Sequence, residues 1–309
     1  HSSYALAAQR SATVPDGIEL YFNLGPREED RSTDPSLTIG LTGYGDVAFA
    51  PARMAPDSIQ RLLISDRGDK LFIDPPQTVA TGVRNAAGMS FDRAGNLLFE
   101  DNGFSQPANG ENTYSSDELN RINADELGRS VPDFGFAESY VRYSDGVLVN
   151  AAPEYRAPLV SFLPLNGRKS EGAVEIAIAP TGFPSDFRDT VFTAFFGRFG
   201  VGTAKNDENP IVAADPGSGS YLHFINSAQL GNPGGLLAAG GSLYLSDFSS
   251  TGLFFGSGDP PADQAGVIYR ITPLRPASFR DLPSLLQTGS TKASIAWSID
   301  RDAICTLEL

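Results

Sequence analysis

A strand–turn–strand pattern that ends in an acidic residue recurs along this chain and restricts the possible folds more than any other feature. The clearest copy begins with residues 88–91, turns at 93–96, and continues through 97–100 to Asp101. Three further copies begin at Asp46, Val174 and Gly234. Short runs rich in Val, Ile, Leu and Phe between turn residues are typical of β-strands. The sequence therefore predicts a chain made of repeated strand pairs.

The spacing of the copies predicts how these strands are organised. Asp46 and Gly88 are 42 positions apart, whereas Gly88 and Val174 are 86 apart, which leaves room for a degenerate copy around residues 140–149. Periods of about 40–50 residues built from short strands are typical of β-propeller blades. We therefore predict an all-β fold, a β-propeller of about six four-stranded blades, with five blades possible. A β-sandwich is the main rival, and the best helix candidate, residues 117–127, is short.

Length and composition favour one domain. The 309 residues include 32 Gly, 22 Pro and 41% hydrophobic residues, and no Pro- or Ser-rich linker separates two halves of different composition. Closed β-repeat folds often reach this length as one unit. We predict a single propeller domain over residues 1–309, with residues 1–17 as a flexible N-terminal segment.

Charge and hydropathy exclude some partners and suggest a location. The formal net charge of −14 repels phosphate backbones, so we expect no nucleic acid partner. No stretch approaches the roughly 20 apolar residues of a membrane helix, so we expect no membrane insertion. Residues 4–8 could be the tail of a removed signal peptide, and Cys305 is the single cysteine. We predict an acidic protein that is secreted, either periplasmic or extracellular.

Several motifs then resemble one known family. These are TGVRNAAGMSFD at residues 81–92, GNLLFEDNG at 95–103 and SDELNRI at 116–122, together with the strand unit at 233–271. They are similar to the G-L-R-N-P-x-G-L-x-F, D-N-G and D-E-L-N-x-I patterns of the glucose/sorbosone dehydrogenases. That family consists of six-bladed propellers, and the resemblance covers roughly residues 46–273.

The resemblance implies a cofactor, a metal ion and the residues that hold them. It implies pyrroloquinoline quinone (PQQ) and a calcium ion that bridges the cofactor and a loop. Arg84 and Asn85 would contact the cofactor or the substrate. The implied calcium ligands are Asp101, Asn102, Gly103 and Glu118. Two structural interpretations stay open: Arg84 could simply pair with a carboxylate such as Asp101, and the acidic residues could simply accept backbone N–H groups in turns.

The family's catalytic base is missing from its expected place. Histidine is the usual base for removing a proton from a sugar hydroxyl, because its pKa lies near the working pH. No histidine occurs between Ser2 and Arg84, and His223 alternates with apolar residues as a strand histidine does. Glu171 and Lys169 are the remaining candidates for the base and its electrostatic helper.

These observations leave three functions open. The first is a PQQ-dependent sugar dehydrogenase-like, calcium-binding propeller that has lost the standard base. The second is a non-catalytic extracellular propeller that binds a sugar, a glycan or a protein partner. The third is a calcium-dependent hydrolase of the lactonase type, in which a metal activates water.

Overall fold

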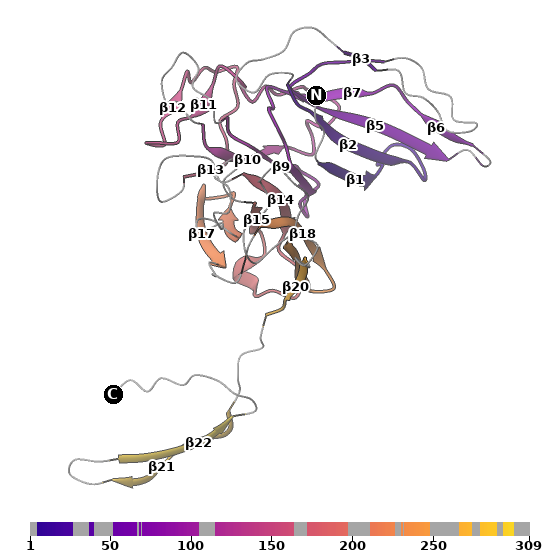
Figure 1. The fold of residues 1–309 in the computed structure, drawn as a ribbon. Coiled ribbons are helices and arrows are strands. Elements are labelled where there is room, and N and C mark those ends of the chain that lie inside the picture. Colours follow the sequence, from indigo (N-terminus) through magenta and orange to yellow (C-terminus); the bar gives the residue numbers. More distant parts are fainter. Residues whose placement is uncertain are drawn as a thin grey trace. The chain divides into compact units, whose positions relative to one another are not determined.

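The protein was analysed as a computed structural model (Figure 1). The structure describes residues 5–26, 37–39, 52–66, 68, 70–104, 115–163, 172–196, 211–225, 230, 232–247, 266–273, 279–288 and 293–299. Its contacts divide the chain into two compact units, His1–Ile271 and Thr272–Leu309, and each is described by itself. The prediction of one domain over residues 1–309 stays a prediction.

The first sheet is arranged around β5 (Ser58–Asp66), its longest strand. β2 (Ile18–Leu24) pairs antiparallel with β5 along one side, and β1 (Leu6–Arg10) continues the sheet beyond β2. On the other side, β7 (Gln77–Thr81) pairs with the first half of β5 and β6 (Leu71–Ile73) with its end. Buried and more exposed residues alternate along much of β2, so one face of the sheet packs into the protein.

Two details of this region bear on the predictions. β1 lies within residues 1–17, whose flexibility stays a prediction. A separate two-stranded sheet is formed by β3 (Leu37–Ile39) and β4 (Ala52–Met54). The predicted strand at residues 46–51 lies outside the described residues.

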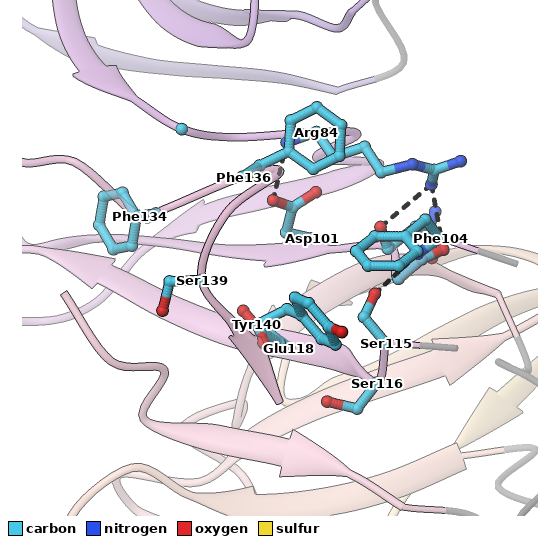
Figure 2. Close-up of a pocket in the computed structure, with 13 residues that line it drawn as sticks. Arg84, Asp101, Phe104, Ser115, Ser116, Glu118, Phe134, Phe136, Ser139 and Tyr140 are labelled. Atoms are coloured by element: carbon cyan, nitrogen blue, oxygen red, sulfur yellow. Dashed lines mark hydrogen bonds between the residues drawn. The ribbon is translucent and has the colours of Figure 1, made fainter. Parts of the chain in front are cut away.

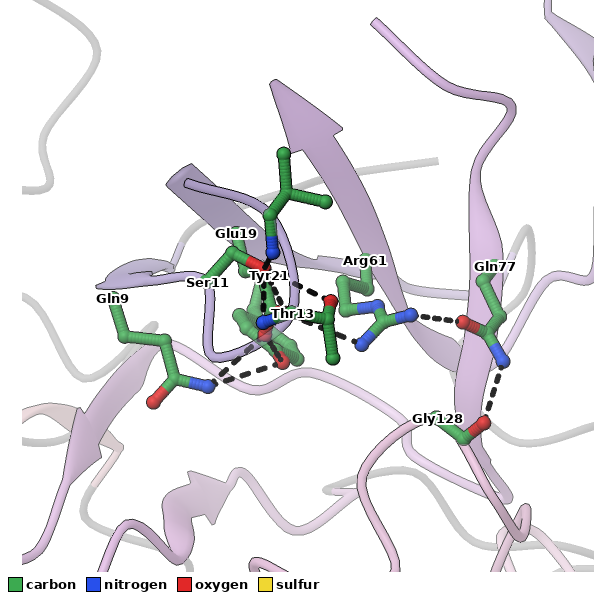
Figure 3. Close-up of polar contacts among 9 residues, drawn as sticks. Gln9, Ser11, Thr13, Glu19, Tyr21, Arg61, Gln77 and Gly128 are labelled. Atoms are coloured by element: carbon green, nitrogen blue, oxygen red, sulfur yellow. Dashed lines mark hydrogen bonds and ion pairs between the residues drawn. The ribbon is translucent and has the colours of Figure 1, made fainter. Parts of the chain in front are cut away.

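A buried polar network fastens the first sheet together (Figure 3). The Tyr21 hydroxyl donates to Glu19 Oε2 at 2.7 Å, and Arg61 Nη1 lies 3.5 Å from Glu19 Oε1. Arg61 also donates to Gln77, which donates to the carbonyl of Gly128 at 3.1 Å. Burial and the Glu19 carboxylate raise the pKa of Tyr21 well above its ordinary value. The network holds β1, β2, β5 and β7 in register and is structural.

The second sheet carries the motifs of the resemblance. Its order is β13 (Val160–Phe162), β10 (Asp117–Ile122), β9 (Leu97–Asp101) and β8 (Gly88–Phe91), with each neighbour antiparallel. The chain between β10 and β13 includes a two-stranded sheet of β11 and β12, which are Tyr140–Val141 and Leu148–Val149. Residues 140–149 are therefore an insertion inside this sheet, and the prediction of a separate degenerate copy there is wrong.

The third sheet is an antiparallel meander of four strands. They are β14 (Ala173–Ile178), β15 (Val191–Phe195), β16 (Ile211–Asp215) and β17 (Ser220–Ile225). A short 3₁₀ helix, η2 (Ser185–Phe187), lies between β14 and β15. Like the second sheet, this meander has the strand number and order of a propeller blade.

The last sheet of the first unit has three described strands. They are β18 (Pro233–Ala239), β19 (Ser242–Asp247) and β20 (Val267–Ile271). The second unit contains an antiparallel hairpin of β21 (Phe279–Thr288) and β22 (Ala293–Ile299).

Successive sheets of the first unit pack against each other through three hydrophobic cores. The first core joins side chains of β2, β5 and β7 to those of β8, β9 and β10. The second joins β9, β10 and β13 to β14, β15 and β16, and the third joins β14, β15 and β16 to β18 and β19. Gly88 permits one close approach, since a Cβ there would lie 2.6 Å from the Cα of Glu175 on β14.

These observations confirm the predicted all-β fold. Outside the 3₁₀ helix η2, the described regular structure consists of β-strands, and residues 117–122 are a strand rather than the start of a helix. No helix in the described part of the chain is long and apolar enough to cross a membrane. Closure of the sheets into a propeller, and the number of blades, stay predictions.

Candidate functional site

One pocket gathers most of the residues that the resemblance singled out (Figure 2). It lies where β9 ends and β10 begins, beside the segment that precedes β8. Among its lining residues are Arg84, Asp101, Asn102, Gly103 and Glu118. Residues 84, 101 and 118 come from three separate stretches of chain, so the fold, not the local sequence, brings them together.

Asp101 fixes the backbone of the Arg84–Asn85 segment. The backbone N–H of Arg84 donates to Asp101 Oδ2 at 2.9 Å, and that of Asn85 donates to Oδ1 at 2.6 Å. The N–H of Asn102 in turn donates to the carbonyl of Asn85 at 3.1 Å. Asn85 is thus held at the edge of the site through its backbone, and both carboxylate oxygens of Asp101 serve a structural purpose.

The Arg84 side chain turns toward the loop that follows β9. Its Nη1 donates to the carbonyl oxygens of Asn102 and Gly103, at 3.1 Å in each case. Hydrogen bonds from a charged donor are stronger than those between neutral groups. The guanidinium therefore holds the two carbonyls that were predicted to face a calcium ion.

Two more buried carboxylates brace the backbone around this loop. Asp117 Oδ1 accepts the N–H of Gly103 at 2.8 Å, and its Oδ2 accepts the N–H of Gly172 at 3.0 Å. Glu100 Oε1 accepts the N–H of Ala87 at 2.8 Å. In these cases a side-chain carboxylate satisfies backbone donors that would otherwise be buried without a partner.

Gly103 is required by the tight packing of the loop. A Cβ at this position would lie 2.1 Å from the carbonyl oxygen of Ser115, closer than any side chain could approach. The Ser115 hydroxyl accepts the N–H of Phe104 at 2.8 Å, which closes the base of the loop. The D-N-G motif is thus explained locally by backbone packing.

Burial and crowding raise the pKa values of the acidic groups in the site. Burial, and then the Asp101 charge, raise the pKa of Glu118 to about 8. Burial raises the pKa of Asp101 to about 6, although the N–H groups of Asn85 and Arg84 and the Arg84 charge act in the opposite direction. Burial also raises the pKa of Glu100 well above its ordinary value. Glu118 is therefore mostly a neutral carboxylic acid at pH 7.

The pocket is small and has unsatisfied polar atoms near it. The space that the centre of a water molecule can reach is about 20 Å³, enough for one water, one hydroxyl group or one ion. Within the described part of the chain, Ser116 Oγ and Asn102 Oδ1, on lining residues, are buried without a hydrogen-bond partner, as is Asn85 Oδ1 beside the site. Buried polar atoms of this kind call for a partner such as a water or a ligand.

Aromatic side chains form another part of the wall. Phe104 packs edge-on against Tyr140, with ring centroids 4.9 Å apart, and also contacts Phe136 at 6.4 Å. Phe134 and Ser139 complete this side of the pocket. These side chains were not singled out for the pocket from the sequence: Phe104 follows β9, and the others lie in the segment between β10 and β13.

The remaining candidates are Lys169, Glu171 and His223. Lys169 and Glu171, the predicted substitutes for the missing base, lie outside the described residues. His223, the one histidine in the described part of the chain, is on β17 and does not line the pocket. Among the residues described here, the group that could hold a proton at this pocket near neutral pH is Glu118.

The arrangement of the described residues does not fit a bound calcium ion. Calcium takes about six to eight oxygen ligands, whereas here the Asn102 and Gly103 carbonyls accept from Arg84 and both Asp101 oxygens accept backbone N–H groups. Within the described residues no group of three or more His, Cys, Asp and Glu side chains is placed to hold a metal.

The chain was compared with known proteins. No family model matches it, and no curated protein matches it. Its structure is similar to the holo form of the PQQ domain of pyranose dehydrogenase from Coprinopsis cinerea, with 14% identity, a TM-score of 0.46, and coverage of 79% of this chain and 67% of that one. It is also similar to the PQQ-bound aldose sugar dehydrogenase from Streptomyces coelicolor, with 14% identity, a TM-score of 0.43, and coverage of 86% and 78%.

Proposed function

We propose that the protein binds a sugar at the pocket beside Arg84, on a framework like that of the PQQ-dependent sugar dehydrogenases. The observation that carries the proposal is the lining of this single pocket, where carboxyl, hydroxyl and aromatic side chains meet. Ligand pockets typically combine apolar and aromatic walls with a few polar groups that fix orientation. A sugar offers both kinds of surface, hydroxyl groups and C–H faces.

The geometry suggests how the sugar would bind. The room inside admits one hydroxyl group, so the ring would lie across the mouth with that hydroxyl inserted. Ser116 Oγ is available as a hydrogen-bond partner. Glu118, neutral at pH 7, would donate its own proton to a sugar oxygen. Phe104 and Tyr140 would face the ring.

Calorimetric titration with a panel of monosaccharides and disaccharides tests the proposal. We expect one sugar class to bind with one-to-one stoichiometry, and Ser116→Ala to weaken that binding. Ser185→Ala is the matched control, because Ser185 is exposed on η2 and does not line the pocket. Binding that is equally strong in the wild type, Ser116→Ala and Glu118→Gln would place the sugar site elsewhere.

PQQ-dependent sugar oxidation is the second candidate function. It is favoured by the position of the Arg84–Asn85 motif at the pocket and by Glu118, whose pKa of about 8 lies in the range suited to moving a proton. PQQ would supply a two-electron acceptor. Incubation with PQQ, a sugar and an artificial electron acceptor tests this candidate. Dye reduction that is lost in Glu118→Gln would support it, and absence of reduction with every sugar that binds would exclude it.

The calcium-dependent lactonase is not supported by the pocket. That activity requires a metal-held water, and the Asn102 and Gly103 carbonyls accept hydrogen bonds from Arg84 instead. A protein partner and a secreted location stay predictions.

A further inference from the structure

The loop after β9 is organised around a positive charge that the chain itself supplies. Arg84 Nη1 lies 3.1 Å from the carbonyl oxygens of both Asn102 and Gly103, so a single nitrogen is shared by two consecutive carbonyls. Two backbone oxygens that converge on one point are a common element of calcium sites. Here that point is occupied by a guanidinium nitrogen.

The surroundings need such a charge. Four acidic residues lie at this end of the sheet, namely Glu100, Asp101, Asp117 and Glu118, and the first three are buried. Arg84 lies against this cluster, because its backbone N–H donates to Asp101 Oδ2 at 2.9 Å. A buried cluster of carboxyl groups is costly unless a cation or a proton compensates for it.

We infer that the Arg84 guanidinium is the resident cation of the Asp101–Gly103 loop and takes the place of the calcium ion that the family resemblance implies. The protein then holds this loop without a metal. The inference concerns the loop alone and does not depend on whether the pocket binds a sugar.

The inference predicts what happens when the guanidinium is removed. In Arg84→Ala the Asn102 and Gly103 carbonyls lose their donor, while Asp101 and Glu118 remain nearby. Oxygen ligands without a compensating cation attract a hard cation. Arg84→Ala should therefore create calcium binding that the wild type lacks.

Calcium titration of the full chain by calorimetry tests this. We expect no saturable binding in the wild type, and one site in Arg84→Ala with a Kd of about 10⁻⁴–10⁻³ M, the range of weak calcium modules. The melting temperature of the wild type should be the same in EDTA and in millimolar calcium, whereas that of Arg84→Ala should rise with calcium. Arg142→Ala is the matched control, because it removes an exposed Arg142–Asp145 pair and should leave calcium binding absent.

Variants that separate the positive charge from the length of the side chain at position 84 sharpen the result. Arg84→Lys keeps the charge and should bind no calcium, whereas Arg84→Gln loses the charge and should bind calcium as Arg84→Ala does. Arg84→Gln serves as the test if Arg84→Ala does not fold. One bound calcium in the wild type, or melting that EDTA lowers, would overturn the inference. So would a folded Arg84→Ala and Arg84→Gln that both take up no calcium.

Discussion

The second sheet (β13-β10-β9-β8) and the last sheet (β18-β19-β20) are two versions of one pattern. In each, the second strand in sequence ends in a buried aspartate, Asp101 or Asp247, that accepts a backbone N–H from the segment before the first strand. The registers place Glu118 opposite Asp101 and Val267 opposite Asp247. In both sheets the aspartate accepts a backbone N–H, but the residue opposite it on the neighbouring strand differs.

This difference distinguishes the residues that hold the backbone in both sheets from those that could bind a ligand in the second sheet alone. Glu118 is half-buried and lines a pocket, whereas Val267 is 41% exposed. The segment before β8 carries Arg84, whose side chain reaches two loop carbonyls. The segment before β18 carries Asn232, whose amide donates to the carbonyl of Phe196 at 2.7 Å. A recurrent acidic residue in such a repeat is therefore weak evidence for a metal site. The residues around it determine whether it could bind a ligand.

The largest expected difference in stability between the two sheets comes from substituting equivalent glycines. Gly88→Ala forces a Cβ to within 2.6 Å of the backbone of Glu175, whereas the Cβ of Gly235→Ala meets only the Ser246 hydroxyl at 3.1 Å. We expect Gly88→Ala to lower the free energy of unfolding by about 3 kcal/mol and Gly235→Ala by less than about 1 kcal/mol. Urea denaturation measures both. Equal losses would show that the sheets do not differ in this packing.

The second-largest expected difference in stability comes from replacing Asp101 and Asp247 by asparagine. Asp101→Asn turns one of two accepting oxygens into an N–H₂ group that faces a backbone N–H, so we expect a loss of about 2 kcal/mol in unfolding free energy. Asp247→Asn can still accept from Asn232 through its amide oxygen, and we expect about 1 kcal/mol or less. A larger loss in Asp247→Asn would contradict the comparison.

Glu118 should make stability depend on pH. Its pKa is raised from 4.5 to about 8 in the folded state, so the neutral form is favoured there. The stabilisation is complete below about pH 4.5 and is lost as the pH rises through about 8. We expect the melting temperature to fall between about pH 5 and pH 9, and Glu118→Gln to reduce that fall by about 5 °C.

The matched control for the pH experiment comes from the last sheet. Val267→Glu places a carboxyl at the equivalent but exposed position, opposite Asp247. Solvent there stabilises the charged form, so this variant should show the same pH dependence as the wild type. An unchanged pH dependence in Glu118→Gln would show that Glu118 is not the group responsible.

The smallest expected effect concerns the pocket alone. Ser116→Ala removes one hydroxyl that has no hydrogen-bond partner among the described residues, so the fold should keep its stability. We expect sugar affinity to fall about threefold to tenfold, the value of one hydrogen bond. Ser242→Ala, on β19 of the last sheet, should leave sugar affinity unchanged. Calorimetric titration of both variants measures the difference.

Much of the strand pattern could be predicted from the chain alone. The strands Gly88–Phe91 and Leu97–Asp101 lie where the pattern of side chains and the flanking turns predicted them, whereas residues 117–122, part of the best helix candidate, form a strand. The prediction of a degenerate copy at residues 140–149 was wrong, because two-residue strands have too few side chains for a reliable pattern. The structure shows them as an insertion within one sheet. Spacing counts residues and cannot tell an insertion from a repeat.

The candidate site was predictable only in part. Motifs singled out Arg84, Asp101 and Glu118, and all three line the pocket. They did not reveal Phe104 or Tyr140, because those side chains reach the pocket from a loop and an insertion with no pattern of their own. Nor did they show the direction of the Arg84 side chain, which depends on where backbone carbonyls lie in space.

The sequence by itself thus determined an all-β chain of repeated strand pairs, because local alternation and turn residues act over a few positions. Only the tertiary structure decided what each acidic residue does. Asp101 accepts backbone N–H groups, the surroundings of Glu118 raise its pKa and favour its neutral form, and Arg84 fills the place predicted for calcium. The reason is physical: burial and the positions of distant carbonyls set charge and hydrogen bonding, and neither is encoded in a short stretch of chain.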